Sequence, residues 1–362
     1  MKIKSILSFV LAGCILFTGC QASKPEDASS NEETCSEVVD SSYDLAVDLT
    51  RLRRGVNMSG LEYVFRQTGF LFDEETYKEL AEKGFDHIRL TTDFRRFADE
   101  DGNLNDSKMK KVDKAIKLAN EQGLIVLLDF HGWYDLNTAK GDDILFMKIW
   151  KNLAERYKDY EHNDMLIFEL INEPHDTEGG NLDMTSLSIL QCLTANAVRE
   201  ISPNRTICFA TTEWNGPWTL KSYKNSPMMN YDNVIVALHT YATLEFTHQN
   251  MAWMNNLGVI VKLDDNILDA LKEQLNDIVD FKEETGVPVI LNEFGLNTDP
   301  DTIPYEDQAR YVQTVVDVLS EQDIPCTWWA YRDGGFGLYK KKNLFSKYEW
   351  NDTIVDILTA EQ

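Results

Sequence analysis

The stretch SKMKKVDKAIKLANEQGLIVLLDF, residues 107–130, contains one complete unit of the fold that this sequence predicts. In its first part, Ser107–Gln122, apolar side chains recur at a spacing of about 3.6 residues, which predicts an amphipathic helix. Gly123 follows where such a helix ends, because glycine readily adopts the backbone conformation of a helix C-terminus. The largely apolar run Leu124–Phe130 then predicts a buried strand of a parallel sheet.

The same alternation continues along the chain from Arg53 onward. Strands are predicted at Arg54–Asn57, His87–Leu90, Leu124–Phe130, Met165–Ile171, Thr206–Thr211, Val234–Leu238, Val287–Leu291 and Cys326–Ala330. Helices are predicted at Glu74–Lys83, Ser107–Gln122, Asp143–Lys158, Ser186–Ile201, Asp265–Glu284 and Tyr305–Gln322. Eight strands in roughly 310 residues predict an α/β fold of the (β/α)8 TIM barrel type. An open α/β sheet is the alternative, but no Gly-x-Gly-x-x-Gly or Walker-type loop supports its usual nucleotide-binding functions.

The N-terminal segment predicts export and a lipid anchor. Lys2 and Lys4 precede an uncharged run that is too short to span a bilayer comfortably. Its end, Leu16-Phe17-Thr18-Gly19-Cys20, resembles a bacterial lipobox, so Cys20 is the predicted lipidation site; a signal with an incidental cysteine is the alternative. We expect a signal peptide over residues 1–20, a disordered acidic and Ser-rich tether over 21–50, and a single barrel domain over 51–362. The protein is therefore expected at the bacterial cell surface or outside the cell.

Charge and cysteine content exclude several classes of partner and site. The net charge of −25 and the pI near 4.6 would repel a phosphate backbone, so we expect no nucleic acid partner, whereas a neutral polysaccharide is permitted. Outside the signal and tether the cysteines are Cys192, Cys208 and Cys326, an odd number at wide spacing. With no Cys-x-x-Cys and no helix-spaced histidine pair, the sequence predicts free thiols, no metal and no cofactor. We expect a monomer that touches the membrane only through its lipid anchor.

Two of the predicted strands run into a glutamate. Residues 168–175 read FELINEPH and residues 289–295 read VILNEFG, which places Glu173 and Glu293 at the carboxyl ends of the fourth and seventh strands. In a (β/α)8 barrel these ends form the active face, and strands four and seven lie on opposed sides of its mouth. Paired carboxylates suit glycosidic bond cleavage, since one must deliver a proton while the other stays ionised. Sequence alone leaves open whether their separation favours retention or inversion of configuration.

Further motifs extend this pattern around the barrel. The Asn-Glu-Pro at 172–174 and the Asn-Glu-Phe-Gly at 292–295 resemble the signatures of glycoside hydrolase family 5, the endoglucanase-rich group of clan A. The resemblance covers nearly the whole chain after Arg53. It also includes Gly55-Val56-Asn57, Arg89, His131, Thr212-Glu213-Trp214, His239-x-Tyr241, Trp328-Trp329 and Gly335-Phe336-Gly337. The family implies a retaining endo-β-1,4-glucanase that acts on cellulose-type or mixed-linkage glucan.

The resemblance also implies roles for individual residues. Glu173 is the acid/base and Glu293 the nucleophile, with Arg89 and Tyr241 bonding the Glu293 carboxylate. A nearby cation would keep that carboxylate ionised.

Other residues are implied in substrate binding and orientation. The family pattern assigns Asn172 and His131 to sugar hydroxyls and His239 to the orientation of Glu173. Trp329, rather than its neighbour Trp328, is expected to be the platform under the sugar, and Trp214 to be a further binding residue.

Several features keep alternatives open. His131 is followed by Gly132-Trp133, whereas many close relatives carry a second histidine there, so β-mannan, xyloglucan and mixed-linkage glucan remain alternative substrates. A surface lipoprotein that binds polysaccharide without cutting it is the alternative from another class. Trp133, Trp218 and Trp253 are interpreted first as packing residues, and Glu62 as a solvated acid.

Overall fold

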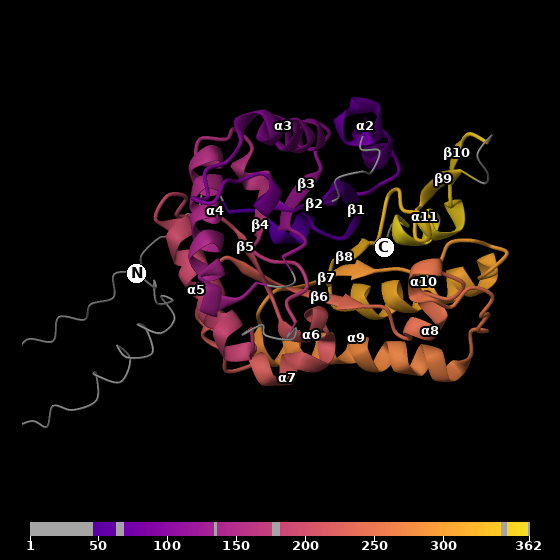
Figure 1. The fold of residues 1–362 in the computed structure, drawn as a ribbon. Coiled ribbons are helices and arrows are strands. Elements are labelled where there is room, and N and C mark those ends of the chain that lie inside the picture. The colour runs from indigo at the N-terminus through magenta and orange to yellow at the C-terminus, as the bar shows by residue number, and fades with distance from the viewer. Residues whose placement is uncertain (1–45, 63–68, 134–135, 176–181, 342–345, 361–362) are drawn as a thin grey trace, which may run out of the picture.

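The structure is a computed structural model that describes residues 46–62, 69–133, 136–175, 182–341 and 346–360 (Figure 1). The predicted signal peptide, Cys20 and almost all of the predicted tether lie outside these ranges. Within them, no helix has both the length and the apolar character needed to cross a membrane.

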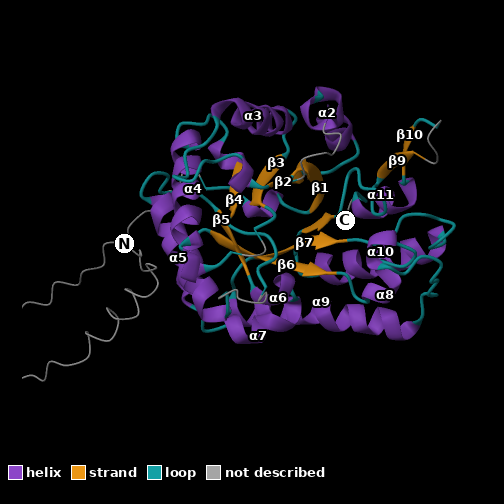
Figure 2. Cartoon of the chain, in the orientation of Figure 1, coloured by secondary structure: helices purple, strands orange, loops and turns teal. Residues whose placement is uncertain are grey.

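Eight parallel strands close into a barrel in the order β1-β2-β3-β4-β5-β6-β7-β8. Their bounds are β1 Arg54–Leu61, β2 His87–Thr92, β3 Ile125–Phe130, β4 Leu166–Glu169, β5 Ile207–Ala210, β6 Val234–Thr240, β7 Val289–Phe294 and β8 Cys326–Trp328. Figure 2 shows these strands at the centre of the domain with helices around them. The (β/α)8 fold predicted from the alternation is confirmed, because the ring closes through the pairing of β1 with β8.

The long helices lie between successive strands on the outside of the barrel. They are α2 Glu74–Glu82, α3 Asp106–Glu121, α4 Asp142–Tyr157, α5 Met184–Arg199, α9 Asp265–Thr285 and α10 Tyr305–Ser320, and α11 Asp352–Leu358 ends the described chain. Several begin at an acidic or amide side chain that accepts a backbone N–H, as at Asn105, Asp183 and Asp264. Gly286, with φ 70°, ends α9 in the left-handed conformation.

Residues on both sides of the predicted domain boundary pack at the amino-terminal end of the barrel. Val47 and Leu52 pack in one buried cluster with strand residues such as Ile125 and Ile167. The Val47 N–H donates to Thr206 Oγ1 at 3.1 Å. The folded domain therefore includes residues 46–50, which the sequence assigned to the tether, because their apolar side chains cover the open end of the barrel.

Several features of the fold differ from the predicted elements or were not predicted. β4 ends at Glu169 instead of Ile171, since its partner β5 is short and pairs only with Phe168 and Glu169. Short helices α6 Thr212–Asn215, α7 Leu220–Tyr223 and α8 Leu244–Thr247 occupy the loops after β5 and β6. A hairpin of β9 Tyr339–Lys341 and β10 Tyr348–Trp350 follows the barrel.

The three cysteines of the domain carry free thiols, as the sequence predicted. Cys208 and Cys326 are buried in the barrel strands, and Cys192 is partly buried on α5.

The substitution Gly55→Ala is expected to lower the free energy of unfolding by about 1–3 kcal/mol. A Cβ at residue 55 would lie 2.2 Å from the His87 ring. That ring is held by Asp86 at 2.5 Å and by Thr327 Oγ1 at 2.8 Å, so it cannot yield without losing these bonds. Urea unfolding of Gly69→Ala is the matched control, because a Cβ there meets nothing within 4 Å. Equal losses in both variants would contradict this account of the β1–β2 packing.

Candidate active site

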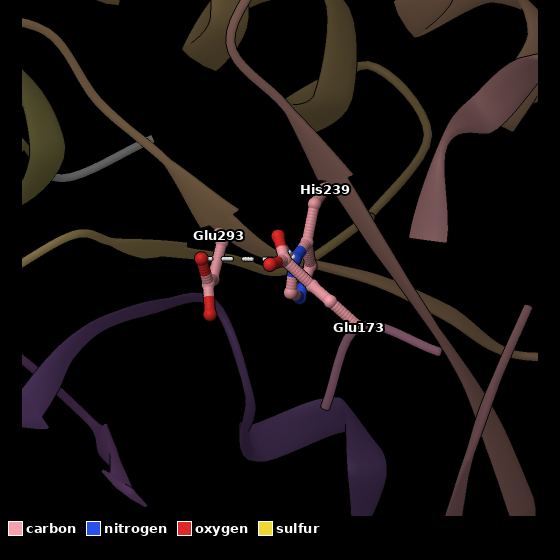
Figure 3. A group of neighbouring side chains, drawn as sticks. All are labelled: Glu173, His239 and Glu293. Atoms are coloured by element: carbon pink, nitrogen blue, oxygen red, sulfur yellow. Dashed lines mark hydrogen bonds and ion pairs between the residues drawn. The ribbon is translucent and has the colours of Figure 1, made fainter. Parts of the chain in front are cut away.

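Glu173, Glu293 and His239 meet at the carboxyl-terminal mouth of the barrel (Figure 3). Glu173 follows β4, Glu293 lies in β7, and His239 lies near the end of β6. Parallel strands bring their carboxyl ends to one face, so residues 66 and 120 positions from Glu173 in the sequence become its neighbours. The sequence prediction that these polar residues gather on one face is therefore matched by the arrangement of the chain.

The distances within this group are short. One ligand atom from each of the three side chains lies within 4.8 Å of the others, so a Glu173 oxygen approaches a Glu293 oxygen to within that distance. His239 Nδ1 is 2.8 Å from Glu173 Oε1 and 3.6 Å from Glu293 Oε2. Glu293 is buried and Glu173 is partly open to the mouth. The two carboxyl groups can thus act on one atom placed between them.

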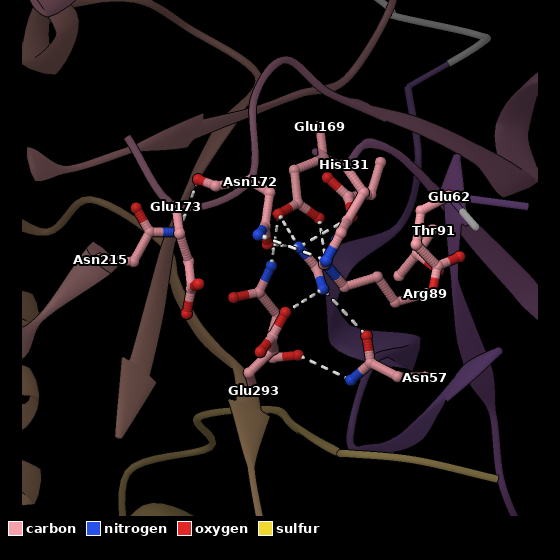
Figure 4. A network of polar contacts seen from close by, with 12 residues as sticks. Asn57, Glu62, Arg89, Thr91, His131, Glu169, Asn172, Glu173, Asn215 and Glu293 are labelled. Atoms are coloured by element: carbon pink, nitrogen blue, oxygen red, sulfur yellow. Dashed lines mark hydrogen bonds and ion pairs between the residues drawn. The ribbon is translucent and has the colours of Figure 1, made fainter. Parts of the chain in front are cut away.

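Arg89 is the centre of a buried polar network beneath Glu293 (Figure 4). It donates to Glu293 Oε1 at 2.5 Å and to both oxygens of Glu169 at 2.7 and 2.8 Å. It also donates to Asn172 Oδ1 and forms an ion pair with Asp129 at 3.0 Å. One guanidinium therefore neutralises several carboxylates that burial would otherwise destabilise.

The remaining predicted residues lie around this network. Tyr241 donates its hydroxyl to Glu293 Oε2 at 3.0 Å, the contact that the family pattern implied. His131 bonds Asp129 at 2.7 Å and stacks on Trp329 with ring centroids 5.6 Å apart. Asn172 Nδ2 lies 3.5 Å from His131 Nε2. The structure thus brings together residues that are widely separated in the sequence.

Environment shifts the pKa values of these groups in different directions. Burial raises the pKa of Glu173, which favours the protonated carboxyl, although nearby cationic groups oppose the shift. Burial also lowers the pKa of His239 to about 4, so its ring is neutral near pH 7 despite the adjacent carboxylates. Burial also lowers the pKa of His131. The Asp129 carboxylate outweighs this effect, however, and raises the pKa of His131 to about 9. Burial therefore favours the protonated form of the Glu173 carboxyl and the neutral form of the His239 ring.

A cavity of about 1670 Å³ lies over the site. Of the predicted residues, Glu173, Glu293, His131, His239, Tyr241, Trp214 and Trp329 line it. Trp328 is fully buried and donates its indole N–H to Phe336 O, so Trp329 is the member of the pair that faces the cavity. Arg89 and Asn172 lie buried below the lining. Direct contact of Asn172 with a sugar therefore stays a prediction.

Some interpretations of single residues change. Trp218 and Trp253, interpreted as packing residues, line the cavity and are 51% and 68% exposed. Trp133 is buried against Phe130, as expected of a packing residue. Glu62 is not solvated: it is buried and accepts bonds from Gly60 N–H and Thr91 Oγ1.

Four further polar residues of the network were assigned no role from the sequence. Asn57, Asp129, Glu169 and Asn215 are all buried around Arg89 or His239. One feature of the sequence could have indicated them, namely their position at or just after the end of a strand. Many residues without a role share that position.

Glu173, His239 and Glu293 are also a ligand set that a metal ion could in principle use. Each of these side chains already forms hydrogen bonds, however. His239 bonds Glu173, and Glu293 bonds Arg89 and Tyr241. The Arg89 guanidinium at 2.5 Å from Glu293 would repel a second cation. The arrangement fits proton transfer and nucleophilic attack better than metal binding.

Comparison with known proteins identifies the family. The family model described as cellulase (glycosyl hydrolase family 5) matches residues 52–335. Cellodextrinase A of Ruminococcus flavefaciens is 25% identical over 295 residues, which is 75% of this chain and 83% of that protein. Endoglucanase C of Acetivibrio thermocellus is 24% identical over 342 residues, 81% of this chain and 95% of its own length.

Solved structures agree with this assignment. The endoglucanase Cel5A of Thermotoga maritima superimposes with a TM-score of 0.73 at 27% identity, covering 87% of this chain and 99% of that one. The same protein is described in complex with cellobiose and with mannotriose. The chain therefore belongs to the cellulase family, glycosyl hydrolase family 5, and is a glycoside hydrolase.

Proposed function

We propose that the protein is a retaining endo-β-1,4-glucanase in which Glu173 is the acid/base and Glu293 the nucleophile. The observation that carries the proposal is that one oxygen of Glu173 lies within 4.8 Å of one oxygen of Glu293. Retaining enzymes have separations of about 5–5.5 Å, whereas inverting enzymes need about 6.5–9.5 Å to admit a water molecule.

The first step breaks the glycosidic bond and forms a covalent intermediate. Glu293 attacks the anomeric carbon while Glu173 transfers its proton to the leaving oxygen. Arg89 and the Tyr241 hydroxyl bond the two oxygens of Glu293 and hold this carboxylate in a fixed orientation for attack. In the second step Glu173, now a carboxylate, takes a proton from water, and the resulting hydroxide equivalent releases the sugar from Glu293.

The extent of the cavity supports endo action, in which the enzyme binds a glycan at a position within the polysaccharide chain. Its lining runs from Arg96, after β2, to Trp214, Trp253 and Leu257, after β5 and β6. These strands stand on opposite sides of the closed barrel, so a glycan can extend past the catalytic pair in both directions. The exposed indoles offer apolar faces on which pyranose rings stack.

Similarity to endoglucanases supports β-1,4-glucan as the substrate, and cellobiose binds the Thermotoga maritima relative. That relative also binds mannotriose, which favours β-mannan as the second candidate. Reducing-end release on carboxymethylcellulose, barley β-glucan, xyloglucan and mannan, with protein that begins at Tyr43, tests the proposal. Glucan hydrolysis is expected. Inactivity on every polymer would favour the non-catalytic binding alternative.

Location at the cell surface through acylated Cys20 belongs to the same proposal and is supported by the lipobox-like sequence at 16–20. The full-length protein is expected in the detergent phase after Triton X-114 partition, and Cys20→Ser in the aqueous phase. Retention of Cys20→Ser in the detergent phase would exclude this anchor.

The variant Glu173→Ala is expected to lose the alkaline limb of the kcat/KM profile on cello-oligosaccharides. Because burial raises the pKa of Glu173, the proton donor is present below that pKa and is lost as the pH rises through it. Loss of general acid–base catalysis should lower kcat by about 10²–10⁴-fold. With an activated aryl cellobioside, added azide should restore turnover and give the β-glycosyl azide, since this anion attacks the intermediate without a base.

The exposed Glu155 on α4 provides a control, and Glu155→Ala should keep the wild-type profile. An alkaline limb that persists unchanged in Glu173→Ala would assign the acid to another group.

A further inference from the structure

The loop after β5 carries three successive residues with left-handed backbone. Glu213, Trp214 and Asn215 have φ values of 54°, 58° and 58°. This conformation costs a residue other than glycine roughly 1–2 kcal/mol. Such strain persists only where surrounding contacts determine it, and it gathers at functional sites. The loop places the Asn215 side chain, which is fully buried, beside His239.

The orientation of the Asn215 amide is set by the backbone. Its Oδ1 accepts the Thr211 N–H at 3.0 Å, so the oxygen must face Thr211. Its Nδ2 then faces Asn172 O at 3.2 Å (Figure 4). The same Nδ2 lies 3.4 Å from His239 Nε2. An amide nitrogen can only donate. The neutral His239 ring is therefore required to accept at Nε2 and to carry its proton on Nδ1.

This tautomer decides which oxygen of Glu173 can hold the catalytic proton. His239 Nδ1 lies 2.8 Å from Glu173 Oε1. With the proton on Nδ1, Oε1 accepts a hydrogen bond and the carboxyl proton resides on Oε2, free for the leaving oxygen. In the opposite tautomer Nδ1 would accept instead, and it would hold the Glu173 proton on Oε1, away from the substrate.

We propose that Asn215 is a positioning residue that fixes His239 as the Nδ1–H tautomer and thereby directs the Glu173 proton to Oε2. The inference rests on the proposed acid/base role of Glu173. The other charged groups that act on His239 are Glu293, Arg89, Glu169 and His131. The charges of these groups affect whether the His239 ring is protonated. Among the hydrogen bonds of the described residues, only that of Asn215 Nδ2 reaches His239 Nε2.

The first test reads the tautomer directly and does not depend on activity. Histidine ¹⁵N shifts of the full-length protein near pH 7, with His239 assigned from His239→Asn, are expected to show Nδ1 protonated and Nε2 unprotonated. Protonation of Nε2 in the wild-type protein would overturn the proposal.

The second test separates positioning from simple structural support. Asn215→Gly keeps the left-handed backbone without strain and removes the donor. On cello-oligosaccharides, whose leaving group needs a proton, kcat/KM should fall by roughly tenfold to a hundredfold, a part of the usual general-acid contribution. On 2,4-dinitrophenyl cellobioside, whose leaving group needs none, it should stay within about threefold of wild type.

Asn233→Gly is the matched control, because Asn233 is also left-handed, with φ 52°, but precedes β6 at the opposite end of the barrel. It should leave the ratio of the two rates unchanged. If Asn215→Gly lowers kcat/KM equally on both substrates, Asn215 has only a structural role. If it lowers kcat/KM on neither substrate, the proposal is also overturned. A wild-type protein inactive on both substrates would instead refute the proposed function, while the ¹⁵N result would still stand by itself.

Discussion

Glu293→Gln is expected to lower kcat on β-glucan by roughly 10⁴-fold or more, the scale seen when a residue essential to a covalent mechanism is removed. The glutamine amide keeps the shape of the side chain but cannot form a glycosyl ester. Arg89, 2.5 Å from Oε1, would also lose its charged partner there. Reducing-end release, with substrate binding followed by the quenching of tryptophan fluorescence, measures the effect.

Binding should survive in this variant, since glutamine keeps the shape of the side chain and the exposed indoles of the cavity are untouched. Glu273→Gln, an exposed position on α9, is the matched control and should retain full activity. If Glu293→Gln keeps activity within about tenfold of wild type, the nucleophile must be sought elsewhere.

Arg89→Met is expected to destabilise the fold by about 3–5 kcal/mol, the usual cost of leaving buried charges without their partner. Arg89 is fully buried against Asp129, Glu169 and Glu293. Burial already raises the pKa of Glu169, and Arg89 opposes that shift. Loss of the cation should raise the pKa of Glu169 further.

The destabilisation should therefore depend on pH. A carboxyl whose pKa is raised by folding costs stability above that pKa and costs none once it is protonated in both the folded and the unfolded chain. The deficit of Arg89→Met in urea unfolding should be largest at neutral pH and should shrink as the pH falls. Arg310→Met, at a largely exposed position on α10, should change stability by less than about 1 kcal/mol. A comparably small effect for Arg89→Met would contradict the network described here.

The fold could be predicted from sequence because it rests on local patterns. A helix-spaced segment, a glycine and an apolar run recur along the chain, as in residues 107–130, and each pattern reflects burial on one face. The glutamates after β4 and in β7 could be predicted for the same reason, since strand ends define the active face. The bounds of β4 could not, because its end depends on the length of its partner β5.

Contacts between distant strands could not be predicted. Glu169 and Asn215 contact Arg89 and His239 respectively, and nothing local in the sequence distinguishes them from ordinary buried residues. Glu62 illustrates the opposite error. It was interpreted as a solvated acid, but it directly follows β1 beside β2, where Thr91 and the Gly60 N–H bond its buried carboxylate. The hairpin β9–β10 was missed because its strands are very short and pair only with each other.

Trapping of the covalent intermediate is the most direct test of the proposed mechanism. An activated 2-deoxy-2-fluoro-β-cellobioside should inactivate the enzyme, add one fluorocellobiosyl group to its intact mass, and label the peptide that contains Glu293. Label on a different residue, or turnover of cello-oligosaccharides that first releases the α-anomer without any adduct, would contradict a retaining mechanism with Glu293 as nucleophile.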